Sequence, residues 1–133
     1  NVQPWHFIVV KNKATLQKIA EITPNARMAK EAPLAIVVCG DMRNEGNDLV
    51  REFWVQDASA ATQNILLAAH AMDLGAVWTG TYPAQNRCEA ISLLLNLPSS
   101  IIPFSTIVIG YPKEMQQPKD KWKEENISYE VFG

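Results

Sequence analysis

The sequence has little of what most catalytic sites are built from. Its 133 residues include only two cysteines and two histidines. Cys39 and Cys88 lie far apart and outside any CxxC pattern, so we expect two free thiols in a reducing compartment, with a single disulfide as the alternative. His6 and His70 have no second ligand at a metal-binding spacing. A metal site is therefore not expected.

Long apolar runs and a strong charge of either sign are also absent. The formal net charge is -2 and the pI is about 5.7, so neither a nucleic acid nor an anionic membrane is expected as the main partner. No uninterrupted apolar run approaches the roughly 20 residues that a transmembrane helix needs. We therefore expect a cytoplasmic protein.

Common catalytic and nucleotide-binding motifs are missing as well. No GxGxxG follows a strand and no GxxxxGK(S/T) occurs, so the phosphate-binding backbone of dinucleotide folds and P-loops is absent. A Ser-His-Asp triad could in principle be formed by Ser59, His70 and Asp57. However, no motif places Ser59 on the strained strand-to-helix turn that exposes a nucleophilic serine. An enzyme with this composition needs a cofactor to carry its chemistry.

Hydrophobic periodicity predicts a mixed order of strands and helices within one domain. The predicted strands are Trp5–Lys11, Leu34–Cys39, Ala76–Thr81 and Ser105–Tyr111, and the predicted helices are Thr15–Ile22, Ala26–Glu31, Phe53–Leu74 and Gln85–Leu97. Because the strand runs are apolar on both faces, we expect an α/β sandwich with helices on both sides of one sheet. The sequence starts at Asn1 and enters a strand almost at once, so residues 1–133 are expected to be a single domain that lacks its N-terminal segment.

The predicted helix Phe53–Leu74 is the longest element and is rich in alanine. Its second half has little polar face, which is typical of a helix covered on several sides, in a packed core or at a subunit interface. Gly75 is the expected helix stop. The preceding segment, Asp41–Asp48, is polar and is expected to be a substrate loop.

The C-terminal tail, Pro112–Gly133, is polar and rich in Lys and Glu. Its last apolar part, Ile127–Phe132, has a β-like pattern. A terminal strand after such a linker is a candidate for addition to the sheet edge of another subunit.

Three short segments carry groups that could bind a flat, phosphorylated ligand. Asn1 and Gln3 precede Pro4, which favours an extended Gln3 and would place both amides on one side, facing a pyrimidine-like ring edge. The alternative is that these amides bond the local backbone. Neither alternative is excluded by the spacing.

The second segment is Trp78-Thr79-Gly80, where a strand ends in a residue that lets a ligand approach the main chain. A plain strand-to-turn junction with a core tryptophan is the alternative. The third segment carries Lys119 and Lys121, which fall on one side of an extended chain and could hold a phosphate. A solvated run of charges is the alternative there.

Taken together, three segments resemble the nitroreductase family of flavoproteins, in matching order and over nearly the whole chain. They are NVQPWHFIVV, QDASAATQNILLAAHAMDLGAVWTG and IVIGYPKE followed by KDKW. The resemblance implies a homodimeric α/β sandwich with a mostly antiparallel sheet, a C-terminal strand exchanged between subunits and two FMN sites at the interface. It places Asn1 and Gln3 against the flavin from across the dimer. It also places Val77, Trp78, Thr79 and Gly80 near flavin N5, and Lys119 and Lys121 near the phosphate.

The resemblance further implies an enzyme that moves electrons from NAD(P)H through flavin N5 to a small oxidised acceptor such as a nitroaromatic or a quinone. One departure is that the family's early Arg-Ser-x-Arg stretch would lie before Asn1. The arginines present, at positions 27, 43, 51 and 87, stand in other contexts. A degenerate flavin- or nucleotide-binding homologue, or a dimeric scaffold, is therefore the alternative.

Overall fold

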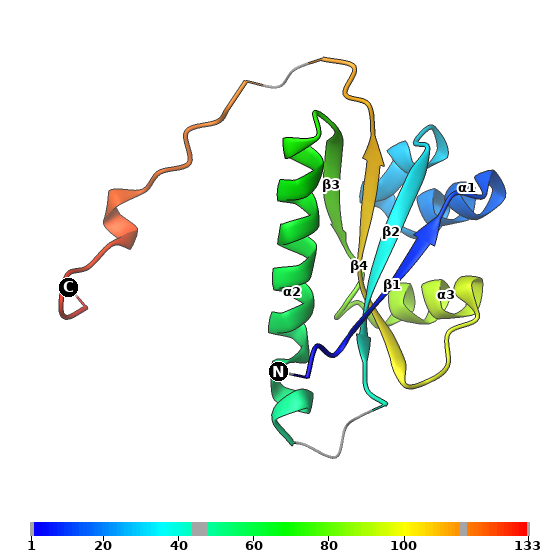
Figure 1. The fold of residues 1–133 in the computed structure, drawn as a ribbon, viewed down its shortest axis with the longest axis horizontal. Helices are drawn as coiled ribbons and strands as arrows, with labels where there is room; N and C mark the ends of the chain where they lie inside the picture. Colours follow the sequence, from blue (N-terminus) through cyan, green and yellow to red (C-terminus); the bar gives the residue numbers. More distant parts are fainter. Residues whose placement is uncertain (1, 44–47, 115–116, 133) are drawn as a thin grey trace.

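Four strands form one antiparallel sheet with helices on both faces in the computed structural model (Figure 1), which describes residues 2–43, 48–114 and 117–132. The strand order across the sheet is β1-β2-β4-β3, and each neighbouring pair is antiparallel. The predicted fold class is therefore confirmed. In chain order, the elements are β1 (Trp5–Val10), α1 (Lys13–Ile22), η1 (Pro24–Lys30), β2 (Leu34–Asp41), α2 (Asp48–Ala71), β3 (Gly75–Gly80), α3 (Gln85–Leu95), β4 (Ile101–Gly110) and η2 (Glu124–Asn126).

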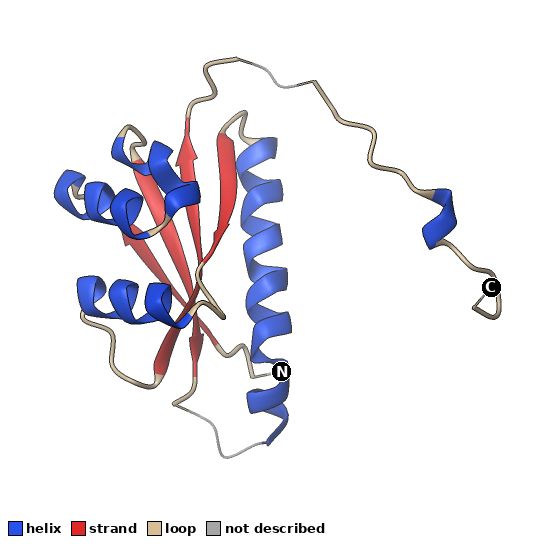
Figure 2. Cartoon of the chain, turned by 180° about the vertical axis from the view of Figure 1, so that it is seen from behind, coloured by secondary structure: helices blue, strands red, loops and turns tan. Residues whose placement is uncertain are grey.

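The sheet separates two hydrophobic cores, one under each helical layer (Figure 2). On one face, α1, η1 and α3 cover Val37 of β2 and Val108 of β4. On the other face, the single long helix α2 covers Val38 and Ile107 of the same two strands. The central strands are thus buried on both sides, as their continuous apolar runs predict.

Helix α2 approaches the sheet closely because small residues face it. A Cβ atom added to Gly40 would lie 2.8 Å from Cζ3 of Trp54, so the indole rests directly on the β2 backbone. Further along α2, the Thr62 hydroxyl donates to the Ala58 carbonyl at 2.8 Å and lies 2.9 Å from the Ser105 hydroxyl. Since a hydroxyl has one proton, Ser105 must be the donor to Thr62. Although α2 has 24 residues, no described helix is both long enough and apolar enough to cross a membrane.

The end of α2 differs from the prediction. The helix ends at Ala71, and Gly75, the expected stop, instead opens β3. The turn is made by Asp73, which has a φ of 58°, while the Leu74 amide donates to the Ala69 carbonyl at 2.9 Å. Asp tolerates the left-handed region better than most residues because its short side chain can bond locally. The prediction for Gly75 was therefore wrong.

The C-terminal tail runs away from the domain past α2 (Figure 1). Its described residues contain the short helix η2 but no strand, so the strand predicted over Ile127–Phe132 is wrong for a single copy. A strand needs a neighbour for its backbone groups, and none lies beside this segment. Ile127, Tyr129 and Val131 alternate along it and are 38%, 83% and 75% exposed.

Replacing Gly40 with alanine tests the close contact between α2 and the sheet. We expect Gly40→Ala to lower the free energy of unfolding by about 1–3 kcal/mol, because Trp54 must move away from the new methyl group. Urea unfolding measures the change. Gly80→Ala is the matched control, because a Cβ there has no atom within 4 Å, and equal losses in both variants would contradict the contact.

Both cysteines are free, as expected, and Cys39 is fully buried on β2. Burial raises the pKa of the Cys39 thiol from 9.0 to about 12, so the folded state holds the neutral thiol while the unfolded chain ionises. This contribution to stability is complete below pH 9 and is lost as the pH rises towards 12.

We therefore expect a thiol reagent at pH 8 to modify Cys39 only after unfolding, because the native thiol is neutral and inaccessible. We also expect Cys39→Ala to unfold with a shallower pH dependence above pH 9 than the parent protein. Mass spectrometry of the labelled protein and chemical unfolding across this pH range measure the two effects. Rapid native labelling of Cys39, or identical pH slopes, would show that the thiol is not buried.

Candidate functional site

The end of β3 combines an open strand edge with empty space in front of it. Within the described residues, β3 pairs only with β4. A Cβ atom on Gly80 would meet nothing within 4 Å. Trp78 is 37% exposed and its ring lies 5.9 Å from that of Phe104, whereas Thr79 is buried and its hydroxyl donates to the Thr106 carbonyl at 2.7 Å. A flat ligand can therefore reach the backbone at Gly80.

The register of the sheet directs the Gly80 N–H and C=O towards the open edge of β3. Ladder hydrogen bonds alternate along antiparallel strands, so every second residue directs its N–H and C=O away from its neighbour strand. The Thr81 amide donates to the Phe104 carbonyl at 3.1 Å, which makes Thr81 an inward-facing residue. Gly80, opposite Ser105, is consequently an outward-facing one. Its amide is a donor at the open edge.

Arg87 contacts the same residue from the first turn of α3. Its Nη1 donates to the Gly80 carbonyl at 3.1 Å. The turn between β3 and α3 brings the two together, and the Ala84 amide closes this turn by donating to the Thr81 carbonyl at 3.0 Å. Sequence reasoning missed Arg87, because a separation of seven residues across a chain reversal has no recognisable pattern.

Gln3 lies at the opposite edge of the sheet, just before β1. It is exposed, but its φ is 52°, so the expected extended conformation was wrong. The Trp5 amide donates to the Gln3 carbonyl at 2.8 Å and closes a turn around Pro4. This local bond overrides the preference for extended backbone before proline. Asn1, the other predicted amide, lies outside the described residues.

Gln3 and Gly80 lie at the same end of the sheet but cannot meet within one chain. β1 and β3 run in opposite directions, so the start of one and the end of the other share an end. However, the two strands are the outer members of the order β1-β2-β4-β3, which separates them by about 14 Å at the usual strand spacing. A ligand touching both residues would need a second copy.

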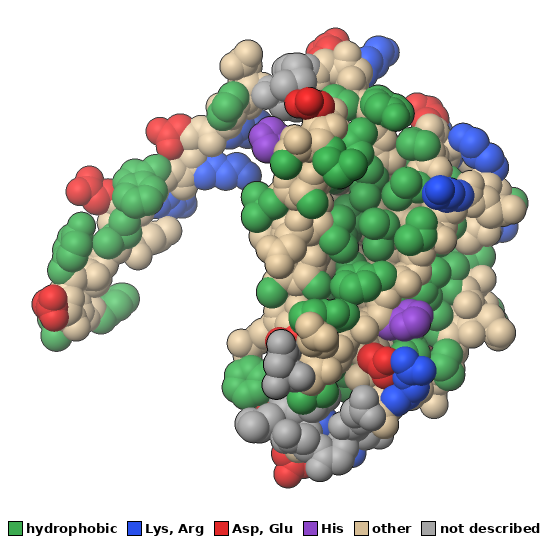
Figure 3. Space-filling model, in the orientation of Figure 1, with side chains coloured by type: hydrophobic (Ala, Val, Ile, Leu, Met, Phe, Trp, Pro, Cys, Tyr) green, Lys and Arg blue, Asp and Glu red, His purple; other side chains and the backbone are tan. Residues whose placement is uncertain are grey.

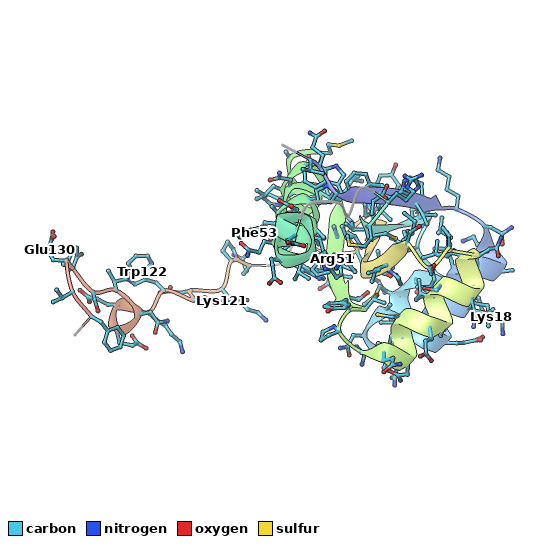
Figure 4. The ribbon with its side chains drawn as sticks, turned by 90° about the horizontal axis from the view of Figure 1, so that it is seen from below. Lys18, Arg51, Phe53, Lys121, Trp122 and Glu130 are labelled. Carbon is cyan, nitrogen blue, oxygen red and sulfur yellow. The ribbon has the colours of Figure 1, made fainter. Side chains whose placement is uncertain are left out.

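The two predicted phosphate-binding lysines lie on the tail. Lys119 and Lys121 are exposed, and Figure 4 shows Lys121 and Trp122 well separated from the domain. The Asp120 carboxylate between them accepts from the Trp122 amide at 2.9 Å. One copy of the chain therefore does not bring these lysines to β3.

An apolar surface covers the outer side of α2 and the neighbouring part of β1 (Figure 3). Phe53, Ala60 and Leu67 are seven residues apart and so lie on one side of α2, where Phe53 and Leu67 are 46% and 57% exposed. On β1, the alternate residues Phe7 and Val9 face the α2 side of the sheet and are 42% and 57% exposed. We call these five residues the α2–β1 surface. Such a patch marks an interaction site.

The last residue of β2, where the expected substrate loop starts, is a paired carboxylate. Asp41 accepts from Nε of Arg43 at 2.8 Å, and its second oxygen is bound by Nη2 of the same guanidinium. Arg43 thereby lowers the pKa of Asp41 below its usual range. The rest of the expected substrate loop is only partly visible, because residues 44–47 lie outside the described residues.

The alternative catalytic sets are not assembled. The Ser59 hydroxyl donates to the Val55 carbonyl at 2.7 Å, within its own helix. Asp57 and His70 lie on the same helix 13 positions apart, which at its usual rise separates them by about 20 Å. Among the residues that the structure describes, no group of three His, Cys, Asp or Glu side chains could hold a metal ion.

Known proteins share this fold and much of this sequence. The model of the nitroreductase family matches residues 23–111. A protein of Methanothermobacter thermautotrophicus that carries the name NADH dehydrogenase/NAD(P)H nitroreductase is 50% identical over 130 residues, which are 98% of this chain and 66% of that protein. The chain thus spans slightly less than two thirds of this curated relative.

Solved structures agree with these matches. A protein of the same name from Bacteroides thetaiotaomicron superposes with a TM-score of 0.91 at 43% identity, covering 99% of this chain and 75% of that one. An FMN-dependent nitroreductase from Clostridium difficile superposes with a TM-score of 0.86 at 28% identity, covering 98% of this chain and 78% of that one. The family model, the curated relative and the shared sheet together show that this chain belongs to the nitroreductase family.

Proposed function

We propose that this chain forms most of a homodimeric oxidoreductase that binds FMN at the subunit interface and takes electrons from NAD(P)H. The name of the archaeal relative includes NAD(P)H nitroreductase, and the clostridial structure is called an FMN-dependent nitroreductase. The observation that carries the proposal is the end of β3, where the Gly80 amide lies at an open strand edge and a Cβ atom on Gly80 would have no atom within 4 Å.

The residues at the end of β3 fit an isoalloxazine ring. Gly80 presents an outward amide without a side chain, and Trp78, on the same face of the strand, is 37% exposed. Val77 is equally exposed but lies on the opposite face, where it lines a pocket with Met28 of η1. A fixed backbone donor stabilises negative charge that develops on a bound group without any reorganisation. When bound, FMN supplies the redox chemistry, between NAD(P)H and an oxidised acceptor such as a nitroaromatic or a quinone. The chain needs to bind and orient these partners and requires no acid–base pair of its own.

A second copy of the chain completes the site. The α2–β1 surface is apolar, exposed and built around a long helix, which is what an obligate interface requires. Pairing along it would bring Gln3, and Asn1 before it, of one copy towards the Gly80 edge of the other. A ligand bound between the two copies could then contact both edges, which lie on opposite sides of the sheet within one chain.

The tail supplies the remaining contacts in this proposal. Lys119 and Lys121 bind the FMN phosphate as point charges, since lysine lacks the bidentate fork of arginine. Beyond them, Ile127, Tyr129 and Val131 present alternate apolar side chains that are 38%, 83% and 75% exposed in their own copy. We propose that this segment adds to the β1 edge of the second copy, because β1 is an outer strand of the described sheet and pairs there only with β2.

The full-length protein tests the proposed cofactor. We expect a yellow protein with flavin absorbance that bleaches when NAD(P)H is added under nitrogen, because the bound flavin becomes reduced. Absorbance spectroscopy measures both properties. Buffer without protein, carried through the same steps, is the blank. A colourless protein that cannot be loaded with FMN would refute the proposal.

The two tail lysines test the proposed phosphate site. We expect the double change Lys119→Ala and Lys121→Ala in the full-length protein to weaken FMN binding by about tenfold or more, because two charge-assisted contacts are lost. Fluorescence titration with FMN measures the affinity, and thermal unfolding checks the fold. The matched control is Lys11→Ala with Lys13→Ala, an exposed pair of the same spacing. Equal affinities in both double variants would remove the tail lysines from the site.

A further inference from the structure

Arg87 carries an inference that rests on the proposed function and adds a residue to its site. The side chain is half-buried, and its Nη1 donates to the Gly80 carbonyl at 3.1 Å. Among the described residues, the Arg87 guanidinium bonds a backbone carbonyl and forms no salt bridge with a carboxylate. A full positive charge therefore lies one hydrogen bond away from the open edge of β3.

The bond to Arg87 also determines how the Gly80 backbone is presented. Glycine has wide conformational freedom, and the last residue of an edge strand has no outer neighbour to hold it. The peptide between Gly80 and Thr81 is held at both ends, because its carbonyl accepts from Arg87 and its amide donates to the Phe104 carbonyl at 3.1 Å. These two bonds set the direction in which the edge faces.

We propose that Arg87 is a positioning residue that holds the Gly80 edge against the flavin and favours its reduced form by charge. Two-electron reduction with uptake of one proton leaves the ring with one additional negative charge. A guanidinium bonded to the Gly80 carbonyl, on the same outer side of β3 as the Gly80 amide, would stabilise that charge more than the neutral oxidised ring. Arg87 consequently tightens binding of reduced FMN more than binding of oxidised FMN.

A purely structural role makes a different prediction. If Arg87 only tied α3 to β3, its removal would loosen the turn and weaken both redox forms of FMN to the same extent. The ratio of the two dissociation constants, which sets the reduction potential of bound FMN relative to free FMN, would then be unchanged. This ratio separates the two roles and does not depend on turnover.

The experiment uses the full-length protein with FMN and the variants Arg87→Gln and Arg87→Lys. We expect Arg87→Gln to lower the reduction potential of bound FMN, equivalent to a loss of about fivefold in the preference for the reduced form, as for a half-exposed charge pair. Arg87→Lys should retain most of the parental potential, because it keeps the charge. Spectroelectrochemical titration measures the potential, and oxidised FMN binding is measured separately by fluorescence.

Arg27→Gln is the matched control, because Arg27 is an exposed arginine on η1, which packs near the opposite end of β3. Its potential should equal that of the parent protein. A potential unchanged in Arg87→Gln, or lowered equally in Arg27→Gln, overturns the role of Arg87 while leaving the proposed function intact. If Arg87→Gln does not fold, Arg87→Ala carries the same test: a preference for reduced FMN that falls about fivefold supports the role, and a parental potential overturns it. A parent protein that binds no FMN overturns both proposals.

Discussion

The packing of α2 on the sheet is the contact on which the rest of the structure depends. Trp54 lies directly on Gly40, and a chain of hydroxyl groups links Thr62 to Ser105 across the same interface. These contacts allow one helix to cover the centre of a sheet whose middle strands are apolar on both sides. They also fix which side of α2 remains outside, with its row of exposed apolar residues.

The packing of α2 leaves apolar surfaces and strand edges of the domain exposed. The α2–β1 surface is uncovered, and both outer strands of the described sheet have open edges. Apolar side chains on the tail are equally uncovered. In the dimer that we propose, a second copy would cover both the exposed helix face and the exposed residues of the tail. In the proposed dimer, the cofactor site arises because opposite edges of two sheets meet, which no single chain can achieve.

Much of the fold could be predicted from sequence because the strongest signals come from burial. The run Leu34–Cys39 and the alanine-rich helix after Phe53 both identify their elements correctly, since continuous apolar character has few alternative placements. Local backbone choices were harder. Asp73 makes the turn expected at Gly75, and Gln3 leaves the extended region, because single hydrogen bonds decide between conformations of similar energy.

In the candidate site, too, some features could be predicted from the sequence and others could not. The segment ending at Gly80 was identified by resemblance, and the register then explains why its backbone faces outwards. The contribution of Arg87 could not be predicted, because it depends on how a turn folds back. Contacts that cross between copies leave no periodic signal in one chain, which is why the partners of Gln3, Lys119 and Lys121 stay predictions.

Diffraction from crystals of the full-length protein grown with FMN tests the central claim most directly. We expect density for a planar three-ring system between Trp78 and Gly80 of one copy and Gln3 of the other, with the two α2 helices in contact. Copies that do not meet along α2, or a ring bound away from the end of β3, would contradict it.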